Sequence, residues 1–184
     1  MRVVSGSARG CKLQPVPGMN TRPTTDRVKE KVFNLIQDHI REAAVLDLFA
    51  GTGQLGIEAL SRGAASCDFV EHNGTAYNVV AKNIQTARVQ ERARTHRMEA
   101  DAFLAKAGAK RFSLIFLDPP YGGIILENAL RSIERFDILS ANGIIICESA
   151  VEDRFAHGFE VVRERRYGAT MITVLRRQDG GTDE

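Results

Sequence analysis

The chain has 184 residues, 43% of them hydrophobic, and a formal net charge of +2, which fits one domain with a sizeable core. No apolar run is long enough to span a bilayer, and the first residues lack the apolar stretch of a signal peptide. The three cysteines and four histidines are scattered, so they predict reduced thiols, no disulfide framework and no metal site. We therefore expect a cytoplasmic protein without membrane contact.

The first twenty residues differ in composition from the rest of the chain. They contain several glycines and prolines around short apolar pieces, which predicts a small hairpin or extended arm that adds little core. Basic residues outnumber acidic ones over residues 1–31, and a basic segment of this kind suits a polyanionic partner. We predict that Arg2, Arg9 and Lys12 hold the phosphates of a nucleic acid.

Regular elements follow the arm. Thr24 or Thr25 can cap a helix whose apolar spacing continues to Ile40, and Asp26 suits its positive N-terminus. Strand-like and helical runs then alternate, which predicts right-handed βαβ units and a parallel sheet. The expected strands are 44–50, 67–71, 94–98, 112–118 and 143–148, and the expected helices between them are 54–61, 75–87, 101–107 and 124–136.

The end of the chain breaks this alternation. Two strand-like runs, 159–167 and 170–177, meet across Gly168 and predict an antiparallel hairpin. Five arginines, at positions 163, 165, 166, 176 and 177, form a second basic cluster on these runs. The polar, glycine-rich residues 178–184 are expected to be disordered.

A glycine-rich turn follows the first predicted strand. Gly51, Gly53 and Gly56 let the backbone approach a ligand closely, and Glu71 at the end of the next strand can accept both hydroxyls of a ribose. The glycine spacing alone fits NAD as well as other adenosine cofactors, or an empty structural loop.

Two further carboxylates favour S-adenosylmethionine. Asp47 lies inside the strand before the loop, where it can support the loop or meet an ammonium group, and Asp101 can accept a hydrogen bond from an adenine amine. S-adenosylmethionine offers an ammonium, a ribose and an adenine to such a set. The predicted cofactor-binding residues are Asp47, Phe49, Gly51, Thr52, Gly53, Glu71, Asp101 and Ala102.

The most informative motif is Asp118-Pro119-Pro120-Tyr121, which ends the apolar run 112–117. Two prolines cannot continue a central strand, so the chain leaves the sheet where open α/β sheets bind ligands. A carboxylate and a backbone carbonyl at this point can accept the two N–H groups of an aryl amine, and the tyrosine ring can stack on its base. The alternative is a strand-terminating turn with a packed tyrosine.

These motifs resemble the class I S-adenosylmethionine methyltransferases that modify exocyclic amines, and more closely the RsmD family, bacterial enzymes that methylate N2 of one guanine in 16S ribosomal RNA. The resemblance covers residues 1–177. It is carried by NTRPTTDRVKE (20–30), VLDLFAGTGQLGIEALSRG (45–63), FVE (69–71) and FLDPPY (116–121). The first segment is the most specific, because general methyltransferases lack it. One departure is Glu99-Ala100-Asp101, where the family more usually has Gly-Asp.

The resemblance implies a Rossmann-like α/β fold with a mostly parallel seven-stranded sheet, an antiparallel C-terminal hairpin, helices on both faces and a small N-terminal hairpin or arm. The predicted boundaries are residues 1–20 for the RNA-binding arm, 21–177 for the methyltransferase domain and 178–184 for the tail. It also implies 16S ribosomal RNA as partner, within the small subunit or an assembly intermediate. The sequence does not fix the oligomeric state, although we expect a monomer.

The implied reaction is transfer of the sulfonium methyl group to guanine N2. Asp118, Pro119, Pro120 and Tyr121 would hold the amine and base, while Arg22, Thr24 and Thr25 would lie beside the site and contact the RNA. Three alternatives remain: a DNA adenine-N6 methyltransferase, an NAD-dependent oxidoreductase and a non-catalytic RNA-binding module. The first would generally need an added recognition domain and the second a substrate domain, and the intact motifs count against the third.

Overall fold

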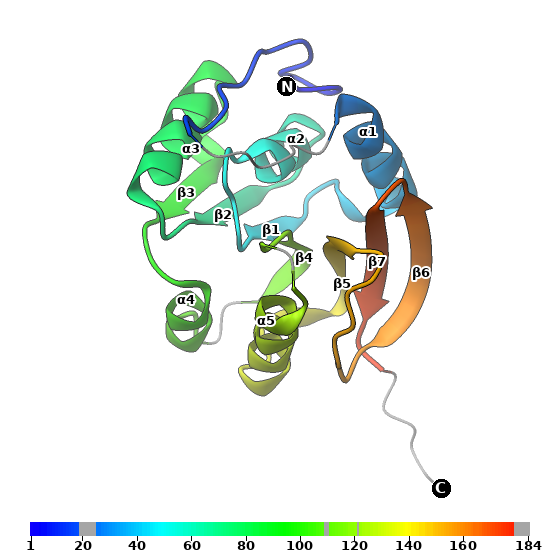
Figure 1. The fold of residues 1–184 in the computed structure, drawn as a ribbon. Helices are drawn as coiled ribbons and strands as arrows, with labels where there is room; N and C mark the ends of the chain where they lie inside the picture. Colours follow the sequence, from blue (N-terminus) through cyan, green and yellow to red (C-terminus); the bar gives the residue numbers. More distant parts are fainter. Residues whose placement is uncertain (19–24, 109–110, 121, 179–184) are drawn as a thin grey trace, which may run out of the picture.

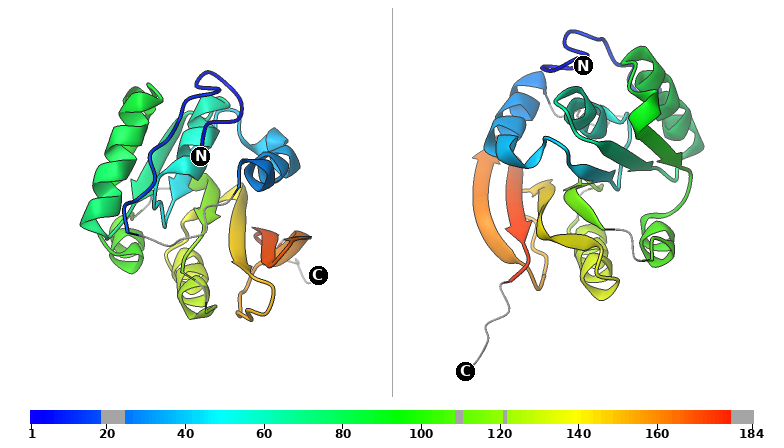
Figure 2. Two further views of the ribbon diagram at one scale, coloured as in Figure 1. Left: turned by 45° about the horizontal axis from the view of Figure 1, so that its top comes forward. Right: turned by 180° about the vertical axis from the view of Figure 1, so that it is seen from behind.

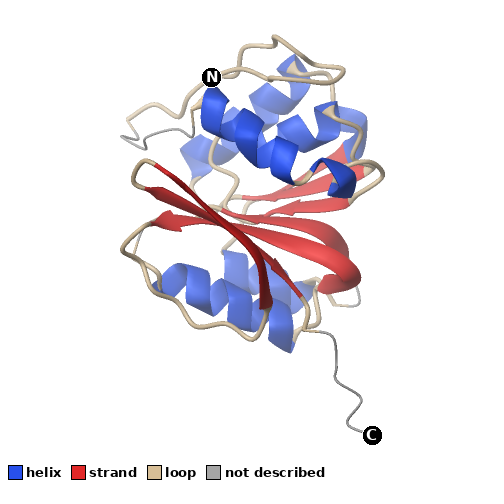
Figure 3. Cartoon of the chain, turned by 90° about the vertical axis from the view of Figure 1, so that its right-hand side faces the viewer, coloured by secondary structure: helices blue, strands red, loops and turns tan. Residues whose placement is uncertain are grey.

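The protein, described by a computed structural model, is a three-layer sandwich with one central sheet (Figures 1 and 3). The structure describes residues 1–18, 25–108, 111–120 and 122–178. The sheet has seven strands in the order β3-β2-β1-β4-β5-β7-β6. The five strands from β3 to β5 pair in parallel, while β7 runs antiparallel between β5 and β6. This topology confirms the predicted sheet and its C-terminal hairpin.

The strands are short where they are parallel and longer toward the hairpin. Their bounds are β1 Ala44–Asp47, β2 Ser66–Val70, β3 Ala93–His96, β4 Phe112–Leu117, β5 Leu139–Ala150, β6 Glu160–Tyr167 and β7 Thr170–Arg176. Buried residues on the two faces of β1, β4 and β5 alternate, so consecutive side chains enter two separate core layers.

Helices cover both faces of the sheet (Figures 2 and 3). On one face lie α1 (Asp26–Leu35), α2 (Gln54–Ser61) and α3 (Gly74–Thr86); on the other lie α4 (Ala100–Lys106) and α5 (Ile124–Arg135). Two short 3₁₀ helices span Gln37–His39 and Gln90–Arg92. No helix among the described residues has the length and apolarity needed to cross a membrane.

The first helix is shorter than the sequence predicts. Thr25 caps it, since its hydroxyl accepts a hydrogen bond from the Val28 N–H at 3.3 Å. The α-helix ends at Leu35, and a 3₁₀ helix follows it. Ile36 and Ile40, on either side of the 3₁₀ helix, are still buried in the same core layer. The apolar spacing correctly predicted which side chains are buried, but it did not show that the α-helix ends and a 3₁₀ helix follows.

The N-terminal segment forms a small hairpin that is fastened to the sandwich. Arg2 and Lys12 form an antiparallel bridge, and the Val3 N–H donates to the Cys11 carbonyl at 2.9 Å. Val3 and Leu13 are buried in the core layer shared with α1, α2 and α3. The expectation that this segment adds little core is therefore wrong, because Val3 and Leu13 belong to this core layer and Val16 is buried as well.

Glu58, in the middle of α2, holds the hairpin in place. Its carboxylate accepts from the N–H groups of Val4 and Ser5 at 2.9 and 3.0 Å. It also forms a fully buried ion pair with Lys29 of α1 at 3.4 Å, and a second pair with Arg62 at 2.9 Å. Burial lowers the pKa of the Lys29 ammonium, although the neighbouring Glu58 charge opposes this shift. One carboxylate thus joins the hairpin, α1 and α2.

The C-terminal basic cluster is divided between two roles. Arg176 makes a bidentate pair with Glu160, at 2.8 and 3.0 Å, and Arg177 binds the Asp137 carboxylate. Arg176 thus joins the two strands of the hairpin to each other, and Arg177 holds the end of β7 to the segment between α5 and β5. Arg163, Arg165 and Arg166 instead lie exposed on the edge strand β6, which agrees with the use of charge to protect a sheet edge.

Candidate active site

The glycine-rich turn between β1 and α2 lies at the carboxyl edge of the sheet. Gly51 and Gly53 both have positive φ, 58° and 80°, and Gly53 is the N-cap of α2. A side chain at Gly53 would be strained in this conformation. The turn is closed by a hydrogen bond from the Gly53 N–H to the Ala50 carbonyl at 2.7 Å. The first N–H groups of α2 therefore face the edge where a ligand can bind.

Gly56 serves a different purpose, which is close packing of α2 against β2. A Cβ atom added there would lie 2.3 Å from Cε1 of Phe69 and 2.7 Å from Sγ of Cys67. The Gly56 N–H also donates to the Asp47 carboxylate at 3.0 Å. This third glycine of the motif is thus required by the fold rather than by a ligand.

Asp47 supports the turn from below. It is almost completely buried, and that burial raises the pKa of its carboxyl to about 7, reinforced by the nearby charge of Glu71 and opposed by the hydrogen bond from Gly56. Of the two roles predicted for Asp47, loop support and an ammonium contact, the structure displays the first.

Glu71, at the end of β2, joins the turn to the start of α3. One carboxylate oxygen accepts from the Gly51 N–H at 2.9 Å, and the other accepts from the Asn73 N–H at 2.8 Å. Each carboxylate oxygen has further acceptor capacity, so both remain able to bind hydroxyl donors. Asn73 in turn caps α3 by accepting from the Ala76 N–H.

The remaining predicted cofactor residues surround this edge. Thr52 follows Gly51, and its carbonyl accepts from the Asn83 side chain of α3 at 2.9 Å. Phe49 packs against the α4–α5 core layer. Asp101 and Ala102 lie exposed in the first turn of α4, where the Asp101 carboxylate accepts from Ser132 of α5 at 3.3 Å. Contacts of these residues with a cofactor stay a prediction.

Asp118 follows β4, the strand beside β1. Asp47 of β1 pairs in register with Phe116, so Asp118 lies two residues farther toward the same edge. Burial raises the pKa of Asp118 well above the usual carboxyl range, and the charges of Glu148 and Asp47 raise it further. Pro119 is buried and Pro120 exposed. Tyr121 lies outside the described residues.

Glu148 is the residue near this site that sequence reasoning missed. Leu117 of β4 pairs with Cys147 of β5, which places Glu148 beside Asp118. A signal was available, because Glu148, like Asp118, ends an apolar strand-like run. Ionisation of one carboxylate makes ionisation of its neighbour less favourable, because the two negative charges repel each other. Asp118 and Glu148 are therefore expected to titrate as a pair.

The predicted RNA-binding residues lie on the hairpin and α1. Arg9 and Lys12 are exposed, while Arg2 is paired with Asp26 at 3.4 Å. Thr25 is the helix cap described above, and Arg22 and Thr24 lie outside the described residues. Among the described residues there is no group of three His, Cys, Asp or Glu side chains able to hold a metal ion, and the three cysteines are unbridged.

Comparisons with known proteins show which proteins this chain is similar to. The family described as "Conserved hypothetical protein 95" matches residues 1–176. YlbH of Bacillus subtilis is 40% identical over 184 residues, covering 97% of this chain and all of that protein. Ribosomal RNA small subunit methyltransferase D of Escherichia coli is 39% identical over 154 residues, covering 83% of this chain and 76% of that protein. The solved structure of yhhF from Escherichia coli has a TM-score of 0.85 at 36% identity and covers 97% of this chain and 99% of its own.

Proposed function

This chain belongs to the RsmD family of S-adenosylmethionine-dependent rRNA methyltransferases, and on that premise we propose that it methylates the exocyclic N2 of one guanine in 16S ribosomal RNA. The observation that carries the proposal is the position of Asp118. It lies at the carboxyl edge of β4, next to the strand that supports the glycine-rich turn. An amine held at Asp118 is therefore adjacent to a cofactor held by that turn.

The residues present fit the cofactor. Glu71, which already binds the Gly51 N–H of the turn, is the proposed acceptor of the ribose hydroxyls, and the turn from Gly51 to Gly53 allows the close backbone approach that an adenosine ligand needs. When bound, S-adenosylmethionine supplies an electrophilic methyl group on a sulfonium. The chain itself then has to bind the acceptor amine, orient its lone pair toward that methyl and exclude water.

Asp118 performs the orienting step in this proposal. Its carboxylate and the Pro119 carbonyl accept from the two N–H groups of guanine N2, which turns the nitrogen lone pair out of conjugation with the ring. The N–C bond forms as the S–C bond breaks, and the amine then loses one proton to solvent or to the carboxylates. Tyr121 is the proposed stacking partner of the base, which has to leave its own stack to reach this edge.

The proposed substrate is 16S ribosomal RNA within the small subunit or an assembly intermediate, and the proposed setting is the cytoplasm with the protein as a monomer. The Escherichia coli relative is by name a small-subunit methyltransferase, which supports this substrate. The exposed basic residues Arg9 and Lys12 of the hairpin supply phosphate contacts.

The product nucleoside tests the function directly. Purified protein and S-adenosylmethionine are added to small subunits from a strain that lacks the enzyme, and the RNA is digested and analysed by mass spectrometry. We expect N2-methylguanosine at one site, located by primer extension. N6-methyladenosine, or methylation of duplex DNA instead, would overturn the proposal in favour of the adenine-specific alternative.

Glu71→Ala is expected to weaken S-adenosylmethionine binding about ten- to a hundredfold. A carboxylate that accepts from ribose hydroxyls makes charge-assisted bonds worth roughly 1.5–3 kcal/mol each, and about 1.4 kcal/mol corresponds to a factor of ten. Titration calorimetry measures the effect. The loss is compounded because Glu71 also holds the Gly51 N–H.

Glu91→Ala, at an exposed position of the 3₁₀ helix after α3, is the matched control and should bind the cofactor normally. Unchanged affinity in Glu71→Ala would remove Glu71 from the cofactor site. A gain in affinity for NAD would point to the dinucleotide alternative.

Arg9→Gln/Lys12→Gln is expected to weaken RNA binding and to make the slope of log affinity against log salt shallower by about one to two, because each phosphate contact releases counterions. Point variants are used because deleting the hairpin would also remove Val3 and Leu13 from the core. The control is Arg94→Gln/Lys106→Gln, which removes two exposed charges from β3 and α4. Equal slopes for the two double variants would show that the hairpin has no special role in RNA binding.

A further inference from the structure

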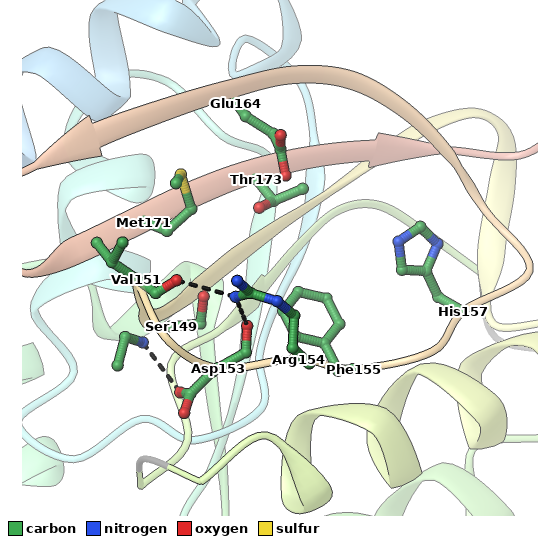
Figure 4. A pocket seen from close by; sticks show the side chains of 10 residues that line it. Ser149, Val151, Asp153, Arg154, Phe155, His157, Glu164, Met171 and Thr173 are labelled. Atoms are coloured by element: carbon green, nitrogen blue, oxygen red, sulfur yellow. Dashed lines mark hydrogen bonds between the residues drawn. The ribbon is translucent and has the colours of Figure 1, made fainter.

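A cavity of about 420 Å³ lies beneath β5, β7 and β6, on the face of the sheet that carries α5 (Figure 4). Its volume is within the range of sites that hold small ligands. The wall is formed by Ser149, Thr173 and Glu164 from three adjacent strands, and by Arg154, Phe155 and His157 from the connection between β5 and β6.

The strand register explains how the wall is built. Side chains of β5 alternate between the two core layers, so Glu148 faces the α1 side while Ser149 faces the opposite side. Thr173 of β7 pairs with Cys147 of β5 on one edge and with Glu164 of β6 on the other. Three polar side chains therefore lie on one face of three neighbouring strands.

The connection that closes the cavity is held at several points. The Ala150 N–H donates to the Asp153 carboxylate at 3.0 Å, and the Ala156 N–H donates to Glu127 of α5, also at 3.0 Å. The Val151 N–H donates to the Ala169 carbonyl of the β6–β7 turn at 3.1 Å. These bonds fix the connection over the sheet instead of leaving it as a free loop.

Two hydroxyls in the cavity lack protein partners. The side chains of Ser149 and Thr173 are only 4% and 2% exposed, and neither hydroxyl forms a hydrogen bond with any residue that the structure describes. Neither is a fully buried polar atom without a partner, since among the described residues only Gln54 Oε1 is of that kind, so both hydroxyls are open to the space of the cavity. From the cavity wall they can donate to, and accept from, the polar edge of a ligand.

The other wall groups narrow the chemistry of that ligand. Phe155 and His157 lie with ring centroids 5.9 Å apart, which offers aromatic surface to a planar ring. Glu164 contributes a hydrogen-bond acceptor beside the hydroxyl of Thr173, as Figure 4 shows. The guanidinium of Arg154, bound to the carbonyls of Val151 and Asp153, adds a positive charge. A planar, amine-bearing ring attached to a phosphate matches this set.

The cavity is also next to the proposed methylation site. A Cβ atom added to Gly123, shortly after the Asp118 motif, would lie 2.7 Å from the Arg154 carbonyl, so the two loops are in contact. Ser149 immediately follows Glu148, which lies beside Asp118. Glu148 and Ser149 are consecutive on β5, so the two sites lie at the same end of this strand and open on opposite faces of the sheet.

We propose that this cavity binds the base of a nucleotide adjacent to the target guanine in the RNA, with its exocyclic amine directed toward Glu164 and the two hydroxyls. The inference rests on the proposed function, because it needs RNA at Asp118. It extends that function by assigning recognition of a second, unstacked nucleotide to residues outside the Asp118 motif. Holding both nucleotides would fix the orientation of the target base.

Ser149→Ala/Thr173→Val tests the assignment with little change in volume. With small subunits from a strain lacking the enzyme, we expect KM to rise about tenfold while kcat and S-adenosylmethionine affinity change much less. Thr86→Val, which removes an exposed hydroxyl from the end of α3, is the control. Thermal melts establish that both proteins are folded, and the single variants Ser149→Ala and Thr173→Val replace the double variant if its melt collapses.

The second measurement uses subunits reconstituted with 16S RNA that lacks the base at one of the two nucleotides flanking the target. The unmodified enzyme should show an approximately tenfold higher KM for one of these RNAs, and the double variant should show no further rise. Equal KM values for the double variant and the unmodified enzyme, or an equal response of both to each abasic RNA, would overturn the inference. If the unmodified enzyme forms no N2-methylguanosine on intact subunits, the proposed function fails instead.

Discussion

Asp118→Ala is expected to lower turnover about a hundredfold or more while leaving S-adenosylmethionine affinity nearly unchanged. The carboxylate would accept from an amine whose hydrogen bonds strengthen as the nitrogen leaves conjugation, so most of its contribution comes in the transition state. Its fixed position between β4 and Pro119 means that the acceptor is already aimed when the base arrives. The loss of such a preorganised acceptor is comparable to the loss of an oxyanion-hole donor.

Single-turnover kinetics on small subunits measures this effect, and calorimetry follows cofactor binding separately. Asp38→Ala, an exposed carboxylate in the 3₁₀ helix after α1, is the matched control and should keep normal turnover. If Asp118→Ala turns over at a near-normal rate, Asp118 is not the amine acceptor, and the motif is a strand-ending turn.

The same role predicts a pH dependence. Burial, Glu148 and Asp47 raise the pKa of Asp118, and the ionised carboxylate is the stronger acceptor for the N–H groups of the amine. Turnover should therefore rise as pH increases through this elevated pKa and fall on acidification at a higher pH than for an ordinary aspartate. Because Glu148 lies beside Asp118, the two carboxylates are expected to titrate together, and the midpoint then belongs to the pair.

Glu58→Ala is expected to destabilise the fold by about 3–5 kcal/mol, the usual result of removing one partner of a buried ion pair. Lys29 would be left fully buried without its carboxylate at 3.4 Å, and the N–H groups of Val4 and Ser5 would lose their acceptor. Urea unfolding followed by circular dichroism gives the free energy. Glu42→Ala would not serve as a control because of its positive φ, whereas the exposed Glu91 suits this purpose.

The deficit of Glu58→Ala should shrink as pH rises. The pKa of Lys29 is already lowered from 10.5 by burial, and loss of Glu58 lowers it further. Between the folded and unfolded pKa values the unfolded chain holds more protons, so stability increases with pH across that interval. In Glu58→Ala the folded-state pKa of Lys29 is lower, so this pH interval begins at a lower pH. The variant therefore starts to gain stability at a lower pH than the unmodified protein does. A deficit that stays constant toward about pH 10 would show that Lys29 does not cause it.

Much of the site could be predicted from sequence because the signals are local. Glycines that permit positive φ, a carboxylate at the end of a strand and two prolines after Asp118 each restrict their own stretch of backbone. The alternation of strands and helices then places all carboxyl ends of the parallel strands at one edge, which brings the Gly51–Gly53 turn and Asp118 together. The predicted fold class was confirmed for this reason.

Helix boundaries and the role of the hairpin were decided by tertiary packing. The apolar spacing up to Ile40 predicts one helix, but the chain tightens into a 3₁₀ turn after Leu35 and still buries the same side chains. Nothing near Val3 or Leu13 in sequence reveals that they join the core layer of α1, α2 and α3. The pairing of Lys29 with Glu58 is equally invisible, since it joins two helices that only the folded sandwich brings into contact.

The sequence by itself determined the class of fold, the glycine-rich turn and the strand-ending Asp118-Pro119-Pro120 motif proposed to bind the amine, since each depends on neighbouring residues and their periodicity. Strand order and register, which depend on how distant segments pack, decided the rest. The pairing of Leu117 with Cys147 puts Glu148 beside Asp118, and the pairing of Thr173 with Glu164 puts a hydroxyl and a carboxylate into one cavity. A shift of one residue in either pairing would turn these side chains to the opposite face and remove both features.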